Sequence, residues 1–349
     1  MWVEHNHWQF PLFDLSVVKP PKREERLDDD HRDYQTKVNL GDEIGMGVYS
    51  LSADGQKQTP GLGTLGCYIE VKRRGRWFTL ALTNYHVVRP LLDGFELTSG
   101  DDPAPSNVAG QDTALYKADL EGITTEQGRQ LDTIEHPSRK THLRIMHILQ
   151  GDIDEAKSQK RKKESKNLKR LEKEYQEKKD FFDKEQHKFD RLWAVSGFSR
   201  RSAAVHRLDW ALIEPTADRI GTNSLPKLND WIRWKRPKHS DDPDTHSHLR
   251  DPSPRATRDQ TEQATIMFKM GTTSGLTAAR YSMCKGAVGI RKARYLTEAK
   301  EKTEEHFFVP CQRRGADDEV NLASKGDSGS VVYNDEGKVV GLLFRGTAP

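Results

Sequence analysis

Short β-rich runs near both ends of the chain, separated by glycine and proline turns, limit the fold more than any other feature. They begin near Ile44 with GVYSL, LGCYIEV and WFTLAL, and they return beyond Thr265 with TIMFKM, HFFVP and SVVYNDEGKVVGLLF. The last run has a Gly-bearing turn between two apolar arms, which is typical of a β-hairpin. Since no long amphipathic helix interrupts either group, the pattern predicts a mainly β protein with two β units.

The segment between the two β units has a different composition and predicts an α-helical insertion at about 152–193. Residues 157–180 contain no Gly or Pro and consist mostly of good helix formers. The apolar residues recur at spacings of three, four and seven, as on one face of a long helix or helical hairpin: Leu168, Leu171, Tyr175, Phe182, Phe189 and Leu192. Two interpretations are open. The stripe rests on the body of the protein, or the basic stretch Lys157 to Arg170 forms a coiled-coil or acidic-partner surface.

The composition of the other segments suggests where the domains end. Residues 1–40 contain paired prolines and dense charge, which predicts an N-terminal tail or docking arm. The first β unit, with its helical insertion, is expected over 41–216. Residues 217–263, rich in Pro, Asp, Ser and His, predict a linker, and the second β unit is expected over 264–349.

The charge balance argues against a nucleic-acid partner, because 56 basic and 53 acidic residues leave a net charge of only +3 among 349 residues. No run approaches the roughly 18 apolar residues of a membrane span. The first thirty residues lack the pattern of a secretion signal. The three cysteines, Cys67, Cys284 and Cys311, fit a reducing compartment. We therefore expect a cytoplasmic or otherwise intracellular protein with no membrane partner, no metal site and no cofactor.

The strongest local motif is Gly326-Asp327-Ser328-Gly329-Ser330, directly before the predicted hairpin. A serine hydroxyl becomes a nucleophile when a neighbouring base takes its proton. Flanking glycines allow a tight turn, so the amides of Gly326 and Ser328 can point at one developing oxyanion. The motif alone is common in turns.

Two further motifs supply the partners that such a serine needs. His86 follows the strand-like run WFTLALTN, and Asp209 precedes the apolar run WALI. A carboxylate entering an apolar run is costly to bury unless a donor such as an imidazole N–H faces it. Taken singly, His86 is better explained as a core histidine and Asp209 as a turn residue at a strand edge.

Taken together, in the order His, Asp, Ser and among β units, these motifs resemble the trypsin-like (chymotrypsin-fold) serine peptidase family. The string 271–277 (GTTSGLT) resembles the turn that opens the second barrel in its intracellular and bacterial-type members. The resemblance covers roughly 44–93, 203–216 and 264–346. It implies two Greek-key β-barrels, the catalytic triad His86, Asp209 and Ser328, and an oxyanion hole formed by the amides of Gly326 and Ser328.

The sequence also departs from that family. No Ile-Val-Gly-Gly follows an Arg or Lys, so activation by a freed N-terminus is not expected, and Asp327 is expected to be structural. Val87 stands where a bracing cysteine often follows the histidine. The chain stops at Pro349, shortly after the strand expected to line the cleft, which predicts a second barrel that is incomplete at its C-terminal end and has an open edge.

By the same resemblance, the base of the specificity pocket falls at Leu322 and Ala323, with Gly346 on one wall. No acidic residue occupies these positions, so apolar or small substrate side chains are expected. The chain is thus predicted to be a serine endopeptidase acting on a protein or peptide substrate. The alternative is a catalytically silent scaffold that binds protein partners through the 152–193 helix or the open C-terminal edge.

Overall fold

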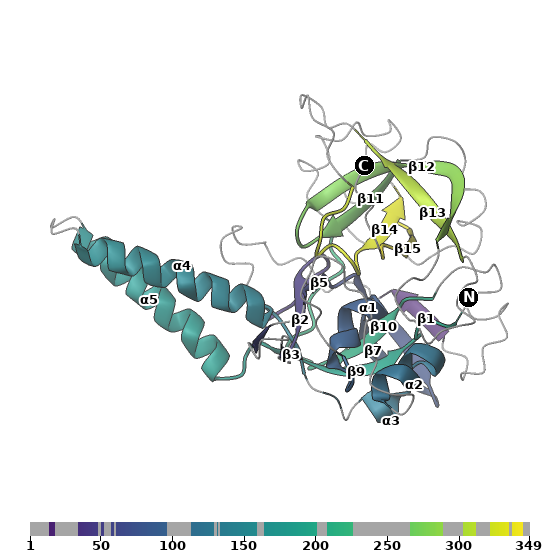
Figure 1. Ribbon diagram of the computed structural model, residues 1–349, viewed down its shortest axis with the longest axis horizontal. Helices are drawn as coiled ribbons and strands as arrows, with labels where there is room; N and C mark the ends of the chain where they lie inside the picture. Colours follow the sequence, from purple (N-terminus) through teal and green to yellow (C-terminus); the bar gives the residue numbers. More distant parts are fainter. Residues whose placement is uncertain are drawn as a thin grey trace.

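The computed structural model describes residues 14–17, 34–47, 50–51, 57–58, 61–95, 113–128, 131, 133–158, 164–200, 208–225, 266–288, 303–311, 322–334 and 337–344. Over these residues the chain forms two curled antiparallel sheets with a helical hairpin projecting to one side (Figure 1). The prediction of a mainly β protein with two β units and a helical insertion is confirmed. The Greek-key connectivity stays a prediction.

The first sheet has eight strands in the order β1-β6-β7-β10-β9-β8-β2-β5. They are β1 (Asp14–Val17), β2 (Glu43–Met46), β5 (Gly63–Thr64), β6 (Cys67–Arg73), β7 (Arg76–Thr83), β8 (Ile134–Glu135), β9 (Lys188–Val195) and β10 (Ala211–Pro215). A separate two-stranded ribbon pairs β3 (Ser50–Leu51) with β4 (Lys57–Gln58). The turn between β6 and β7 places Arg74 and Gly75 at positive φ, 49° and 78°. This two-residue turn matches the right-handed twist of the paired strands.

The second sheet has five strands in the order β13-β12-β11-β14-β15. They are β11 (Ile266–Gly271), β12 (Gly275–Val288), β13 (Thr303–Pro310), β14 (Val331–Asn334) and β15 (Val339–Leu342). The pairing of β14 with β15 confirms the predicted C-terminal hairpin. Among the described strands, β13 and β15 are the two edges of this sheet.

A shared apolar core joins the two sheets. It contains residues of β6, β11, β12 and β14 together with two residues from outside the strands: Leu40, Cys67, Leu225, Phe268, Ala278, Val331 and Tyr333. Full burial of a large apolar side chain contributes about 1.5–3 kcal/mol to stability. The two sheets therefore do not behave as separate units joined by a free linker.

This core corrects two predicted boundaries. Val38 and Leu40 were predicted to lie in the tail, but both are buried. Leu225 was predicted to lie in the linker, and it too is buried, while the Asn223 side chain bonds the Tyr68 backbone at both N (2.7 Å) and O (2.8 Å). Both boundaries were wrong because they were drawn from the high charge and proline content of each segment as a whole. The few apolar residues at the ends of these segments belong to the core. Residues 226–263 of the predicted linker lie outside the described residues.

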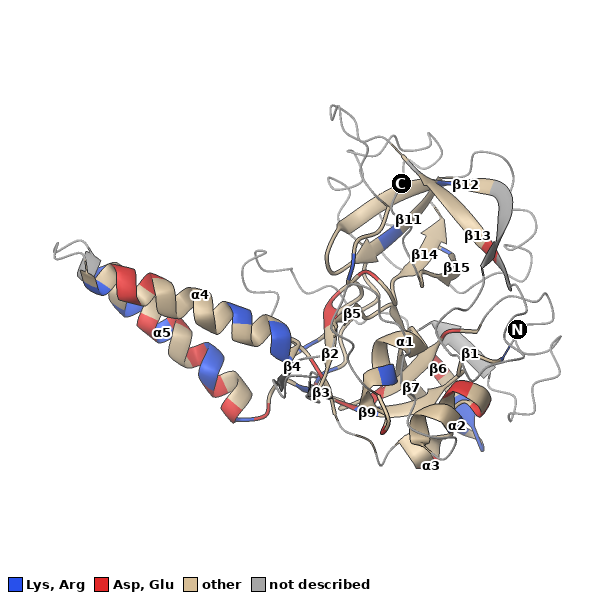
Figure 2. Ribbon diagram, viewed as in Figure 1, with Lys and Arg blue, Asp and Glu red and all other residues tan. Residues whose placement is uncertain are grey.

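The helical hairpin consists of α4 (Arg139–Ser158) and α5 (Glu164–Asp183), which run antiparallel away from the sheets (Figure 1). Its apolar stripe packs one helix on the other, through Leu149, Ile153 and Leu171. Charges of both signs lie along the two helices (Figure 2). Some of them form ion pairs, such as Lys157 with Glu172 between the helices and Arg170 with Glu174 within α5. A coiled-coil contact with a partner stays a prediction.

The predicted bounds of the insertion, 152–193, were wrong at both ends. The helical part begins earlier, at Arg139, and ends at Asp183, and residues 188–195 form β9 between β8 and β10. Phe189 and Leu192, assigned to the helical stripe from their spacing, are instead fully buried in the first sheet. Pairing on both sides outweighs the local helical pattern here.

Short helices cover the end of the first sheet: α1 (Tyr85–Val88), a 3-10 turn (Arg89–Leu91), α2 (Ala114–Glu121) and α3 (Thr125–Gly128). Asp119 on α2 is fully buried and accepts hydrogen bonds from Arg89 and Tyr85. Within the described residues, no helix combines the length and apolar character that membrane crossing requires.

Three stacked rings attach the hairpin to the sheet. Phe182 lies between His142 and His187, with ring centroids 3.6 and 4.0 Å apart, and the Tyr34 hydroxyl oxygen forms a hydrogen bond of 2.9 Å with His142 Nδ1. Burial, reinforced by the nearby His187, lowers the pKa of His142 to about 4. His142 is therefore neutral in the folded protein at neutral pH.

We expect the hairpin attachment to weaken in acid. The unfolded chain protonates His142 below its ordinary pKa of 6.5, while the folded chain resists until about 4, so the free energy of unfolding falls as the pH decreases through this interval. His142→Gln removes this titration, and the drop in thermal midpoint between about pH 7.5 and about pH 5 should be smaller than in the wild type. His147→Gln, at an exposed position of the same helix, is the matched control. Equal drops in all three proteins would contradict the assignment.

Candidate active site

His86 lies where the first sheet meets α1. Strand β7 ends at Thr83, Asn84 begins the short helix, and the Asn84 amide donates to the Asp209 backbone oxygen at 2.7 Å. The neighbours Tyr85 and Val87 point into the core, whereas the His86 side chain is 32% exposed. One helical turn at a strand end thus leaves the imidazole partly accessible.

Asp209 holds His86 through both carboxylate oxygens. Its Oδ2 lies 2.7 Å from His86 Nδ1, and its Oδ1 accepts the His86 backbone N–H at 3.0 Å. The Asp209 side chain is only 5% exposed. Because a carboxylate can only accept, Nδ1 carries the proton and Nε2 is left as the basic nitrogen. The predicted pairing of His86 with Asp209 therefore has the geometry that a general base requires.

Asp112 and Asp119, which also lie between His86 and Ser328 in the chain, are the other carboxylates that could orient His86. Asp119 is engaged by Arg89 and Tyr85, so it does not compete for the imidazole. Asp112 lies outside the described residues.

Ser328 lies on a tight turn that links the second sheet to the first. The turn over 324–330 (nucleophile loop) closes through Asp327 N to Ser324 O at 3.0 Å and Ser330 N to Asp327 O at 3.1 Å. Gly326 and Gly329 adopt positive φ, 108° and 99°. These values favour glycine over other residues, which explains the spacing of the motif.

Thr64 of β5 fastens this loop to the first sheet. Its backbone N–H donates to Ser328 O at 2.8 Å, and its hydroxyl donates to Gly326 O at 2.9 Å. A Cβ added at Gly329 would lie 2.2 Å from Thr83 Oγ1 and 2.3 Å from Thr64 O. The loop therefore rests against the end of β7, three residues before His86.

The backbone amides of the nucleophile loop differ in their hydrogen bonds to described residues. The N–H groups of Asp327, Gly329 and Ser330 donate to backbone oxygens. Those of Gly326 and Ser328 make no hydrogen bond to any described residue. This is the pair that the sequence predicts as an oxyanion hole, and two free, fixed N–H groups are what an oxyanion needs.

The Ser328 hydroxyl is directed to the Phe344 backbone oxygen, at 3.4 Å. Within the described part of the chain, the hydrogen bonds of His86 do not include one to Ser328. Such a bond is often long without substrate and tightens when substrate arrives. The structure thus pairs His86 with Asp209 and places the Ser328 loop beside them, while the bond between base and nucleophile stays a prediction.

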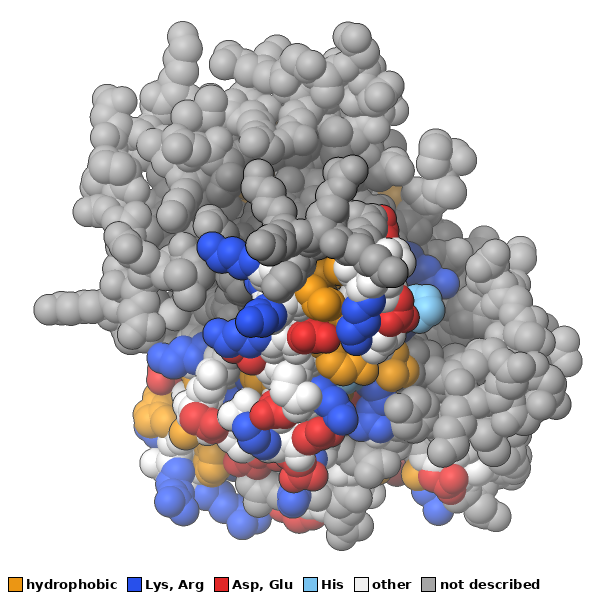
Figure 3. All heavy atoms as spheres, turned by 90° about the vertical axis from the view of Figure 1, so that its left-hand side faces the viewer, with side chains coloured by type: hydrophobic (Ala, Val, Ile, Leu, Met, Phe, Trp, Pro, Cys, Tyr) orange, Lys and Arg blue, Asp and Glu red, His pale blue; other side chains and the backbone are white. Residues whose placement is uncertain are grey.

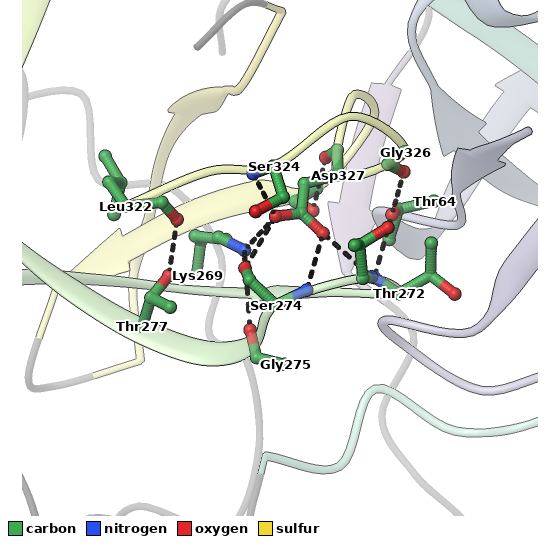
Figure 4. Close-up of polar contacts among 12 residues, drawn as sticks. Thr64, Lys269, Thr272, Ser274, Gly275, Thr277, Leu322, Ser324, Gly326 and Asp327 are labelled. Atoms are coloured by element: carbon green, nitrogen blue, oxygen red, sulfur yellow. Dashed lines mark hydrogen bonds and ion pairs between the residues drawn. The ribbon is translucent and has the colours of Figure 1, made fainter. Parts of the chain in front are cut away.

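Asp327, next to Ser328, is the most heavily bonded side chain of the site (Figure 4). Its oxygens accept from Lys269 Nζ at 2.7 Å, Ser324 N at 2.8 Å, and the backbone and hydroxyl of Ser274 at 3.1 and 2.6 Å. Burial opposes ionisation, but Lys269 and these hydrogen bonds outweigh it, so the pKa of Asp327 lies below its ordinary value. Lys269 is the residue that sequence reasoning missed, because one lysine in TIMFKM gives no sign that it is buried.

The predicted specificity residues are only partly placed. Leu322 O accepts the Thr277 hydroxyl at 2.7 Å, and Ala323 packs against Met267, Val332 and Leu343. Both are therefore held on the second sheet, a few residues before Ser328. Gly346 lies outside the described residues. The predicted preference for apolar or small side chains stays a prediction.

A comparison of the chain with protein-family models and with curated protein sequences finds no match. The evidence for the candidate site is therefore its geometry. The resemblance to trypsin-like peptidases rests on the sequence motifs alone.

Close contact between the sheets at Gly66 gives a test of the loop placement. A Cβ added there would lie 2.4 Å from the Gly329 backbone oxygen, so Gly66→Ala must shift the nucleophile loop. Displacement by about 1 Å can slow a positioned reaction about a hundredfold. We expect Gly66→Ala to reduce the rate of Ser328 modification by a fluorophosphonate by about that factor.

The matched control is Gly61→Ala, because a Cβ at Gly61 meets nothing within 4 Å. It should react at the wild-type rate. Similar rates for the two alanine variants would show that the loop does not depend on this contact.

Proposed function

We propose that the protein is a serine endopeptidase that cleaves peptide bonds through His86, Asp209 and Ser328. The observation that carries the proposal is the contact of both Asp209 oxygens with His86, which leaves Nε2 as a base beside the loop of Ser328. Two amides of that loop, which bond no acceptor among the described residues, support it. The trypsin-like family and its two-barrel fold belong to this proposal, because the motifs resemble that family.

In the proposed reaction, His86 Nε2 takes the Ser328 hydroxyl proton while Ser328 Oγ attacks the substrate carbonyl. The Gly326 and Ser328 amides hold the resulting oxyanion. Asp209 keeps Nδ1 protonated and stabilises the imidazolium. His86 then protonates the leaving amine, which departs as the C–N bond breaks, and the acyl group stays on Ser328. Water, deprotonated by His86, releases the acyl group and restores the serine.

A second candidate function is a catalytically silent scaffold that binds a protein partner. It is favoured by the Ser328 hydroxyl, which points to Phe344 O, and by the hairpin, which projects away from the sheets (Figure 1). Seen from the side on which the hairpin projects, the described surface carries acidic, basic and apolar side chains mixed together (Figure 3). Such a mixed surface suits a protein better than a nucleic acid.

A serine-reactive fluorophosphonate separates the two functions. Covalent labelling that disappears in Ser328→Ala supports the peptidase, and mass spectrometry of the labelled peptide locates the adduct. Folded wild-type protein that stays unlabelled supports the scaffold. Ser324→Ala, a serine of the same loop whose side chain is exposed, controls for general effects of removing a hydroxyl.

The role of Asp209 is tested by Asp209→Asn. The amide that replaces the carboxylate can donate to Nδ1, which reverses the tautomer and removes the base. We expect hydrolysis of a reporter peptide to fall by about four orders of magnitude, with substrate binding retained. His86→Ala and Ser328→Ala should abolish hydrolysis. Undiminished turnover in Asp209→Asn would mean that another carboxylate orients His86.

A further inference from the structure

A buried ion pair lies directly behind the candidate nucleophile. Lys269 of β11 and Asp327 of the nucleophile loop are 2.7 Å apart, and neither side chain is exposed. Removing two charges from water is costly, and a protein whose buried ion pair is replaced by well-packed apolar residues is often no less stable than the original. Stability alone is therefore a weak reason for a charged pair at this position.

The pair organises the turn between β11 and β12 as well as the nucleophile loop (Figure 4). Lys269 Nζ donates to Asp327, to the Ser274 hydroxyl and, at 3.4 Å, to Gly275 O. Asp327 Oδ1 also accepts the Thr273 N–H at 2.9 Å. A Cβ at Gly271 would lie 2.4 Å from Asp327 Oδ1, so the string 271–277 forms a close cradle for this carboxylate.

The direction of the Gly326 and Ser328 amides depends on how the residue between them is held. Asp327 is that residue, and its carboxylate accepts five donors, of which Lys269 is the only charged one. Charge-assisted hydrogen bonds are roughly twice as strong as neutral ones. The ammonium is therefore the strongest single restraint on the turn that presents both amides.

We propose that Lys269 is a positioning residue, which through Asp327 fixes the Gly326 and Ser328 amides in the direction that an oxyanion requires. The proposal rests on the proposed peptidase function. It implies that the cation that restrains the nucleophile loop is supplied by β11 of the second sheet.

The test compares Lys269→Met with Lys72→Met. Methionine keeps the length of the lysine side chain without its charge, and Lys72 is an exposed lysine of β6, outside the candidate site. We expect Lys269→Met to lower the rate constant for fluorophosphonate labelling of Ser328 by about a hundredfold, as loss of an oxyanion donor does, and Lys72→Met to leave it unchanged.

A second readout separates positioning from general loss of structure. Diethyl pyrocarbonate modifies imidazoles without the help of an oxyanion hole, and mass spectrometry follows the peptide that contains His86. Its modification rate should be the same in Lys269→Met and the wild type, since His86 lies on α1 and is held by Asp209, not by the nucleophile loop. Parallel changes at His86 and Ser328 would indicate a general structural effect and overturn the proposal.

The double variant Lys269→Met/Asp327→Asn decides the matter if the single variant does not fold. It leaves no unpaired buried charge, so its thermal midpoint should recover. Fluorophosphonate labelling of Ser328 should stay low in this variant. The side-chain amide introduced by Asp327→Asn places an N–H group where a carboxylate oxygen accepted the Ser324 N–H, so that the restraint on the loop is not restored. Labelling that recovers together with stability would overturn the positioning role. A wild-type protein that is not labelled would instead overturn the peptidase function itself, and the inference with it.

Discussion

The arrangement of this protein depends on one junction, where Thr64 of the first sheet binds the loop of the second. Its N–H and hydroxyl hold the oxygens of Ser328 and Gly326, and its own oxygen accepts the Thr83 hydroxyl at 2.9 Å. The two bonds from Thr64 to the loop join residues about 260 positions apart, 262 in the case of Thr64 and Gly326. The shared apolar core beneath them keeps the two sheets from separating.

Each sheet contributes a different part of the candidate chemistry across this junction. The first sheet supplies a base whose tautomer is set by Asp209, and the second supplies a turn in which the Gly326 and Ser328 amides bond no described residue. The base is held by a short helix and by the two carboxylate oxygens of Asp209. The turn is held by its glycine conformation and by the buried ion pair behind it. Preorganisation of this kind is how a protein lowers a barrier without moving during the reaction.

The sequence was sufficient for features that depend on local pattern. Alternating apolar residues and turn glycines predicted β6, β7, β14 and β15, and the spacing of apolar residues predicted a helical insertion. The candidate residues His86 and Asp209 were found from their positions at the ends of apolar runs. Their pairing was predicted by resemblance, and the structure brings them together at 2.7 Å.

Features that depend on tertiary contacts could not be predicted. Residues 188–193 continue a helical spacing, yet pairing with β8 and β10 makes them a strand. Val38 and Leu225 look like parts of polar segments, because only the folded chain shows that they complete a core. Lys269 has no local signal at all, since a buried cation is recognisable only when its carboxylate, 58 residues away, lies against it.

The central claim is that folding brings the base, the nucleophile and the two amides to one point. A crystal structure of the protein after reaction with a peptidyl phosphonate tests it most directly. The account predicts phosphorus bonded to Ser328 Oγ, its oxygen accepting from the Gly326 and Ser328 amides, and His86 Nε2 within hydrogen-bond distance of the adduct. An adduct on another residue, or one on Ser328 with His86 turned away and the two amides unused, would contradict it.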